Sequence, residues 1–226
     1  MVNWDKLPSY MKNPQVREYY DILLNRKFSL FLKRVLDVCL SAVLIVLLAI
    51  PMLVISLVVK FTSEGPAVFK QIRITTGGRE FKILKFRTMT VNQDKNSSQI
   101  TLTDDDRITG CGRFLRKYRL DELPQLFNVL SGSMSFVGTR PEVPRYVNKY
   151  SPEMYATLLM PAGITSLASI EFKDEEVFMN GEDTDEKYVR LVLPKKMKLN
   201  LEYIRTFSVL KDIKIMFKTL TGVAAG

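Results

Sequence analysis

VCLSAVLIVLLAIPMLVISLVV, residues 38–59, is the most informative part of the sequence for the fold, because none of its 22 residues is charged. As a helix it would rise about 1.5 Å per residue, which makes it about as long as the hydrocarbon core of a bilayer is thick. A single straight membrane span is the simplest interpretation. A signal peptide does not fit, because the run is too long and no small-residue cleavage site follows it.

Two features favour a re-entrant helix over a straight span. Pro51 lies inside the run, where it removes one backbone hydrogen bond, clashes with the preceding turn and breaks the helix. The run is basic on both sides, and basic flanks favour the cytoplasmic face. We therefore expect both ends of the run in the cytoplasm. Asp37 lies where the helix would enter the membrane, and Lys33 or Arg34, one turn earlier, could pair with it. The flanking cations are Arg26, Lys27, Lys33 and Arg34 before the run and Lys60, Lys70, Arg73 and Arg79 after it.

Around this segment the chain divides into three parts. Residues 1–27 are predicted to be an N-terminal extension with one short helix over Gln15–Leu24, and residues 28–62 the re-entrant membrane helix. Residues 63–226 are predicted to form a cytoplasmic domain. It ends in a basic amphipathic segment, residues 195–220, which suits a helix on the membrane surface as well as one packed on the domain.

The net charge of +9 is unevenly distributed. It is +4 over residues 1–60, +4 over 61–99, +2 over 100–150, −6 over 151–190 and +5 over 191–226. Cations beside an apolar run suit a protein that lies against anionic lipid headgroups and handles a phosphorylated substrate. The chain has no helix-turn-helix, zinc-finger or RNP-like pattern, so no nucleic-acid partner is expected.

The chain contains no histidine, which excludes Ser-His and Cys-His catalysis and histidine-ligated metals. Cys39 and Cys111 are too few for a disulfide scaffold or a cysteine-rich zinc site, and they indicate a reducing, cytoplasmic setting. Catalysis must then depend on Asp, Glu, Lys, Arg, Ser, Thr or Tyr.

Beyond the membrane run, two short elements and a loop are predicted. Ala67–Ile74 and Glu80–Phe86 predict two strands that form a hairpin through Thr76-Gly77-Gly78. Residues 92–106 are polar without an apolar period and predict a loop. Its acidic triple, Asp104-Asp105-Asp106, fits a solvated turn better than a cation site.

Asp121 and Glu122 are expected at or just before the start of a helix. Apolar residues at i, i+3, i+4 and i+7 predict a buried helix face. Pro124 is tolerated only in a first turn, and Gly132 is a suitable C-terminal stop. Acidic residues at a helix start usually serve as caps or dipole partners, so spacing alone favours that role. The apolar positions are Leu123, Leu126, Phe127 and Leu130.

A functional interpretation adds the cations near this acidic pair. Phosphoryl transfer needs a nucleophile, positive charge for the phosphate oxygens and usually Mg²⁺. A carboxylate can be the nucleophile by forming an acyl phosphate, and arginine suits a phosphate clamp because it binds in a bidentate way. At a helix start, two adjacent carboxylates can share a ligand. The available cations are Lys85, Arg87, Arg113, Arg116, Arg119 and Arg140.

Four ordered stretches resemble the bacterial sugar transferases, also called monotopic phosphoglycosyl transferases or polyprenyl-phosphate hexose-1-phosphate transferases. They are KRVLD at 33–37, KFRTM at 85–89, LDELPQLFNVL at 120–130 and MSFVGTRP at 134–141. The resemblance covers about residues 30–220, and several motifs in order make it specific.

The resemblance implies an α+β fold: a small, mainly helical catalytic domain with a short β-hairpin, on a proline-broken re-entrant helix with interfacial amphipathic helices. It implies a monotopic protein of the bacterial inner membrane whose catalytic domain faces the cytoplasm. The implied activity is transfer of a sugar-1-phosphate from a UDP-sugar to membrane polyprenyl phosphate, with release of UMP. Such a step initiates assembly of a glycan, such as an exopolysaccharide, a capsule, an O-antigen or a glycoprotein.

The resemblance also implies roles for single residues. Asp121 would attack the β-phosphate and carry the phosphosugar in a ping-pong reaction that needs Mg²⁺ at Asp121 and Glu122. Glu122 would assist as metal partner or proton acceptor. The residues matched to substrate binding are Lys85, Arg116, Arg140 and Pro141, with Arg87 and Arg119 as further candidates.

The chain departs from the family pattern in two places. Many members have Ser before the membrane proline, where this chain has Ile50, so the break depends on Pro51 alone. Residues 161–171 lack the usual basic residue and Gln, and an acidic segment, residues 171–186, follows. Because this region is expected to border the substrate, the sugar is not predicted.

Two alternatives from other classes are kept open. One is a noncatalytic membrane-anchored binding protein, and the other is a relative that transfers the group directly in a ternary complex. The sequence also leaves open the polyprenol length, the glycan pathway and the oligomeric state, with a dimer among the alternatives.

Overall fold

The computed structural model describes residues 1–90, 106–172 and 184–224, which are mostly helical with two small sheets. This confirms the predicted mainly helical domain with a short hairpin. The predicted loop and acidic triple lie outside the described residues except for the exposed Asp106, as does most of the acidic segment 171–186. The helices are α1 (Pro14–Leu24), α2 (Lys27–Leu47), α3 (Ala49–Thr62), α4 (Gly110–Lys117), α5 (Gln125–Ser131), α6 (Pro144–Val147), α7 (Leu167–Glu171), α8 (Thr184–Lys187), α9 (Leu193–Arg205) and α10 (Val209–Ala224).

The apolar run forms two helices rather than one. α2 and α3 meet at Leu48 with a bend of 64°, three residues before Pro51. Proline has no N–H for the carbonyl four residues earlier and its ring clashes with that carbonyl, so the helix cannot continue straight through Leu47. Among the described residues, no single helix is long and apolar enough to cross a membrane, whereas this bent pair qualifies by length and composition.

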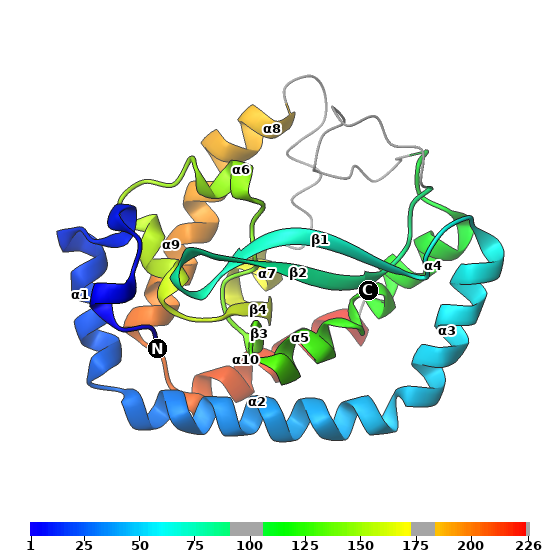
Figure 1. Ribbon diagram of the computed structural model, residues 1–226, viewed down its shortest axis with the longest axis horizontal. Coiled ribbons are helices and arrows are strands. Elements are labelled where there is room, and N and C mark those ends of the chain that lie inside the picture. Colours follow the sequence, from blue (N-terminus) through cyan, green and yellow to red (C-terminus); the bar gives the residue numbers. More distant parts are fainter. Residues whose placement is uncertain (91–105, 173–183, 225–226) are drawn as a thin grey trace.

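The bent pair leaves a broad apolar surface uncovered. In Figure 1, α2 lies along the lower edge of the molecule and α3 turns up along one side. Met52 and Val59 of α3 pack against Phe86 and Leu115 of the domain. Most other large apolar side chains of the pair are exposed, among them Phe28, Phe31, Val43, Val46, Leu47, Ile50, Leu53, Val54 and Phe61.

The predicted hairpin is confirmed with nearly the predicted ends. β1 (Val68–Thr75) pairs antiparallel with β2 (Arg79–Phe86), and Gly77 and Gly78 take the positive φ that the turn requires. A second sheet, which the sequence did not predict, pairs β3 (Met134–Val137) parallel with β4 (Ala162–Thr165). The two strands approach closely through glycine, because a Cβ on Gly163 would lie 2.2 Å from the Gly138 nitrogen.

The N-terminal extension is part of the main core. The predicted helix is confirmed as α1, and Met11, Val16 and Leu23 are completely buried. The Tyr19 hydroxyl donates a 2.6 Å hydrogen bond to Glu153, just before the 3₁₀ segment η5 (Met154–Leu159). The extension therefore packs against the domain as one body with α9 and η5.

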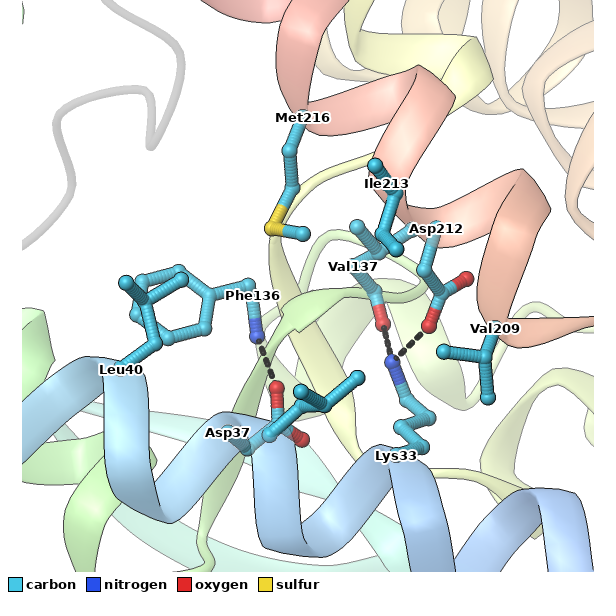
Figure 2. Close-up of a pocket in the computed structure, with 10 residues that line it drawn as sticks. Lys33, Asp37, Leu40, Phe136, Val137, Val209, Asp212, Ile213 and Met216 are labelled. Carbon is cyan, nitrogen blue, oxygen red and sulfur yellow. Dashed lines mark hydrogen bonds and ion pairs between the residues drawn. The ribbon is translucent and has the colours of Figure 1, made fainter.

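A buried polar cluster fastens α2 to the domain, as Figure 2 shows. Lys33 Nζ donates to Val137 O at 2.8 Å and to Asp212 Oδ2 of α10 at 2.6 Å. Asp37 Oδ1 accepts the Phe136 N–H at 3.1 Å. The prediction that Asp37 pairs with Lys33 or Arg34 is therefore wrong, because Asp37 meets an unpaired edge of β3 and Lys33 finds a carboxylate on another helix.

The C-terminal basic segment forms two helices with different surroundings. α9 packs into the core through Met197, Leu201 and Ile204, which resolves the open choice for that half in favour of packing on the domain. α10 buries Ile215 but exposes Leu210, Phe217 and Leu220. In Figure 1, α10 begins beside α2, and the two helices are in contact.

Candidate active site

Two of the predicted cations, Lys85 and Arg140, meet at Glu122. Lys85 Nζ, at the end of β2, lies 2.7 Å from Glu122 Oε1, and Arg140 Nη2 lies 2.9 Å from the same atom. The Glu122 side chain is 9% exposed. Burial alone raises the pKa of Glu122, but the attraction of Arg140 and Lys85 outweighs it and holds that pKa far below its ordinary range. Glu122 is therefore ionised under working conditions and a very weak base.

Asp121 has a different environment from its neighbour. Among residues 1–90, 106–172 and 184–224, no group forms a hydrogen bond with its carboxylate, although the residue is only 7% exposed. Burial raises the pKa of Asp121, opposed by the attraction of Lys85, Arg116 and Arg140. A desolvated carboxylate that has no hydrogen-bond donor but faces cations is suited to nucleophilic attack on a phosphate.

The backbone before the Asp121–Glu122 dyad is strained. Arg119 has φ 57°, the left-handed region that a side chain rarely adopts, and it ends the turn that follows α4. A 3₁₀ turn, η4 (Leu120–Glu122), follows, and Pro124 precedes α5. The dyad therefore stands just before a helix, as predicted, in a turn that presents both carboxylates beside β2.

A buried amide fixes the distance between the dyad and β2. Asn128 Oδ1 accepts the Leu84 N–H at 3.0 Å, and its Nδ2 donates to Lys82 O at 3.0 Å, so the side chain replaces a third strand at this edge. The predicted buried face of α5 is therefore only partly right. Leu126 is buried, but Phe127 and Leu130 are 46% and 37% exposed, because the helix turns Asn128 and Val129 inward to meet the hairpin.

The other predicted binding residues fall into three situations. Arg116 is near Asp121, and its buried Nη1 has no hydrogen-bond partner among the described residues. Arg119 is exposed beside the dyad, and Pro141 is buried next to Arg140. Arg87 does not join them, because its guanidinium donates to Val59 O, Ser63 O and Pro66 O and so fastens the end of α3 to β1.

The dyad offers ligands that suit Mg²⁺. No group of three or more acidic or cysteine side chains that could hold a metal is found in the part of the chain described. Mg²⁺ commonly takes one or two protein carboxylates together with substrate phosphates and water, so the Asp121 carboxylate with a diphosphate fits this ion. Glu122 already contacts two cations through Oε1, which leaves its other oxygen for that purpose.

This geometry agrees with what the chain is similar to. The bacterial sugar transferase family matches residues 28–226. The chain belongs to this family. The KFRTM, LDELPQLFNVL and MSFVGTRP stretches carry Lys85, the Asp121–Glu122 dyad and Arg140 to one place.

Three similar proteins show the extent of the sequence identity. The Aeromonas hydrophila UDP-N-acetylgalactosamine-undecaprenyl-phosphate N-acetylgalactosaminephosphotransferase is 35% identical over 87% of this chain and 44% of its own length. The Caulobacter vibrioides UDP-glucose:undecaprenyl-phosphate glucose-1-phosphate transferase is 39% identical over 84% of this chain and 69% of its own. The Escherichia coli K12 protein of the same name is 39% identical over 84% and 39%. The chain thus spans under half of the length of two of these relatives.

The residues that hold the site together were not predicted from the sequence. Asn128 was not assigned a role although it lies within the LDELPQLFNVL stretch, and Arg73 was named only as a cation that flanks the apolar run. A polar residue at a position that continues an apolar helix face could have indicated Asn128. Arg73 could not be distinguished from the other flanking cations, because only the register of the hairpin places it opposite the turn that carries Arg140.

Proposed function

We propose that this transferase moves a sugar-1-phosphate from a UDP-sugar to membrane polyprenyl phosphate and releases UMP. The observation that carries the proposal is the convergence of Lys85 and Arg140 on Glu122, beside an Asp121 carboxylate to which no described residue donates a hydrogen bond. The activities for which the relatives are named, which differ in the sugar, support the same reaction class. The product would begin the assembly of a bacterial glycan.

The reaction proceeds in two displacements at one phosphorus atom. An Asp121 carboxylate oxygen attacks the β-phosphorus of the donor, the bond from that phosphorus to the bridging oxygen breaks, and UMP leaves with the electron pair. A polyprenyl phosphate oxygen then attacks the phosphosugar on Asp121 and restores the carboxylate. Lys85, Arg116 and Arg140 offset the charge of the phosphate oxygens. Bound Mg²⁺ would supply further neutralisation of the donor's diphosphate at the dyad.

Glu122 holds the cations in place rather than taking up a proton. Its pKa is held far below the ordinary glutamate range by Arg140 and Lys85, so it has little tendency to accept a proton near neutral pH. This favours the metal-partner role over the proton-acceptor role among the two that the resemblance implied.

The membrane placement rests on the exposed apolar surface of the bent pair. Side chains such as Val46, Leu47 and Ile50 are 68–76% exposed, which water would disfavour and a lipid interior would accept. We place this surface in the bacterial inner membrane, with the dyad on the cytoplasmic side. In a Cys39→Ser, Cys111→Ser background, single cysteines at positions 5 and 64 should both react from the cytoplasm; labelling from opposite sides would establish a straight span.

The covalent step is tested with the donor alone. The purified protein, given Mg²⁺ and radiolabelled UDP-glucose, UDP-galactose or UDP-N-acetylgalactosamine without acceptor, should retain label and release one UMP per chain at most. Asp121→Asn should retain none while melting as the wild type does, and the exposed Asp5→Asn should behave as the wild type. Turnover with acceptor but no adduct would favour direct transfer in a ternary complex. No turnover with any donor would favour the noncatalytic binding protein.

A second test concerns the metal. Removal of divalent cations with EDTA should stop both adduct formation and turnover, and added Mg²⁺ should restore both. Unchanged adduct formation in EDTA would refute the assignment of Mg²⁺.

A further inference from the structure

The turn that carries Arg140 is fastened to the hairpin that carries Lys85. Arg73 Nη1 donates to Pro141 O at 3.0 Å, and the Ile74 N–H donates to Glu142 O at 3.0 Å. Arg73 is itself held by Gln71, whose Oε1 accepts from its Nε at 3.1 Å and from its Nη2 at 2.8 Å. In the register of the hairpin Arg73, Gln71 and Lys85 share one face, so the link to the turn and the catalytic cation belong to the same surface.

Glu142 fastens the turn from the other side. Its side chain is buried two residues after Arg140, and its Oε1 accepts a short hydrogen bond from the Tyr188 hydroxyl. Burial lowers the pKa of Arg73 and the attraction of Glu142 opposes that, so the carboxylate lies close enough to act as a counterion in this cluster. A buried carboxylate without such partners would be costly, which indicates that the arrangement is specific.

Tyr188 reaches Glu142 from a far part of the chain. It begins a π-helical turn, η7 (Tyr188–Val192), a geometry that is rare and concentrated at functional sites. Its ring lies 5.0 Å from that of Tyr146, whose hydroxyl donates to Asp185 at 2.6 Å. Two tyrosine–carboxylate bonds therefore join the segment from α8 to η7 to the segment that follows Arg140.

We propose that Tyr188, Glu142 and Arg73 are positioning residues that hold Arg140 at hydrogen-bond distance from Glu122. The proposal rests on the proposed function, in which Arg140 offsets phosphate charge. None of the three need touch the substrate. Their effect is to fix the turn from two sides, so that the guanidinium does not have to be ordered during each turnover.

The test uses Tyr188→Phe, which removes one hydroxyl and keeps the ring. Steady-state UMP release is measured with acceptor and whichever of UDP-glucose, UDP-galactose and UDP-N-acetylgalactosamine turns over fastest. We expect kcat/KM to fall about tenfold, because a buried hydrogen bond to a charged group is lost. In an Arg140→Lys background the same change should cost less than twofold, because the residue on which it acts is already altered.

Tyr203→Phe is the matched control. The Tyr203 hydroxyl also donates to a buried carboxylate, Asp212, at 2.6 Å. This bond joins α9 to α10 and is not part of the cluster that holds Arg140. Tyr203→Phe should lower the melting temperature by a similar amount, and its small effect on kcat/KM should be the same with Arg140 or Lys at position 140. If Tyr188→Phe lowers kcat/KM, full additivity with Arg140→Lys would overturn the proposal, since a purely structural role predicts it.

Hydrogen exchange separates failure of this proposal from failure of the proposed function. Tyr188→Phe should accelerate exchange of the amides in residues 138–142, and Tyr203→Phe should not. Unchanged exchange there would refute the positioning role whatever the activity. Faster exchange with unaltered kcat/KM would support the positioning network and refute the role of Arg140 in the reaction.

Discussion

Gly163→Ala should damage the active site although residue 163 is far from Asp121 in sequence. The added Cβ would lie 2.2 Å from Gly138 N, 2.4 Å from Gly138 O and 2.6 Å from Gly138 Cα. These are backbone atoms of the paired strand, which cannot rotate away. Ordinary contact begins near 3.4 Å, so β3 and β4 must separate locally by about 1 Å.

The separation reaches Arg140 directly. Gly163 N–H donates to Thr139 O at 2.9 Å, and Thr139 precedes the arginine that lies 2.9 Å from Glu122. Overpacking of this size costs about 3 kcal/mol, which lowers the melting temperature of a chain of this length by roughly 6–12 °C. A displacement of about 1 Å at a substrate-positioning group can reduce the rate by about 100-fold.

The assay combines thermal unfolding in detergent with UMP release below the melting transition. Gly222→Ala is the control, because no described residue outside the neighbouring turns of its own helix lies within 4 Å of the added Cβ, and alanine stabilises a helix interior by about 0.5–1 kcal/mol relative to glycine. A Gly163→Ala protein with wild-type melting temperature and kcat/KM would refute the argument that this close approach sets the position of Arg140.

Three further changes test other parts of the structure. Lys33→Met leaves the buried Asp212 carboxylate without its cation, with only the Tyr203 hydroxyl as a donor, and should cost about 3–5 kcal/mol in thermal unfolding. Lys33→Met combined with Asp212→Leu should recover most of this loss; equal losses in both would contradict the pairing argument. Because burial raises the pKa of Asp121 and the nucleophile must be ionised, UMP release should fall as pH drops through a value above the ordinary 3.8. Arg140→Gln removes an attraction that lowers this pKa and should therefore move the acidic limb to higher pH. A shift of the limb to lower pH would contradict the assignment of Asp121 as the ionised nucleophile. Arg87→Lys should lower the melting temperature, because several carbonyls lose a charged donor, and leave KM for the donor unchanged; the reverse pattern would restore its substrate-binding role.

Local patterns predicted the elements that local physics controls. The break in the apolar run follows from the missing N–H of Pro51, and the hairpin follows from glycines at a turn between two short apolar strands. α1 was also predicted, but its burial was not, since nothing in residues 1–27 shows which surface lies opposite Met11 and Leu23.

The choice among chemically equal residues needed the tertiary structure. Arg87 and Arg140 are both arginines within family motifs, yet one fastens α3 and the other meets Glu122. Asp37 was expected to pair within its own helix and instead accepts an N–H from β3. In each case the partner comes from a distant part of the chain, and spacing along the sequence carries no information about it.

The long apolar segment, its break, the hairpin and the family follow from the sequence, because each depends on residue order within a short window. Which side chains share the site depends on contacts between distant parts of the chain. The Gly138–Gly163 contact, the Asn128 bonds to β2 and the ties from Arg73 and Tyr188 bring Lys85, Arg140 and the dyad together. Burial in that arrangement then separates the pKa of Asp121, which rises, from that of Glu122, which falls, although the two carboxylates are adjacent in the chain.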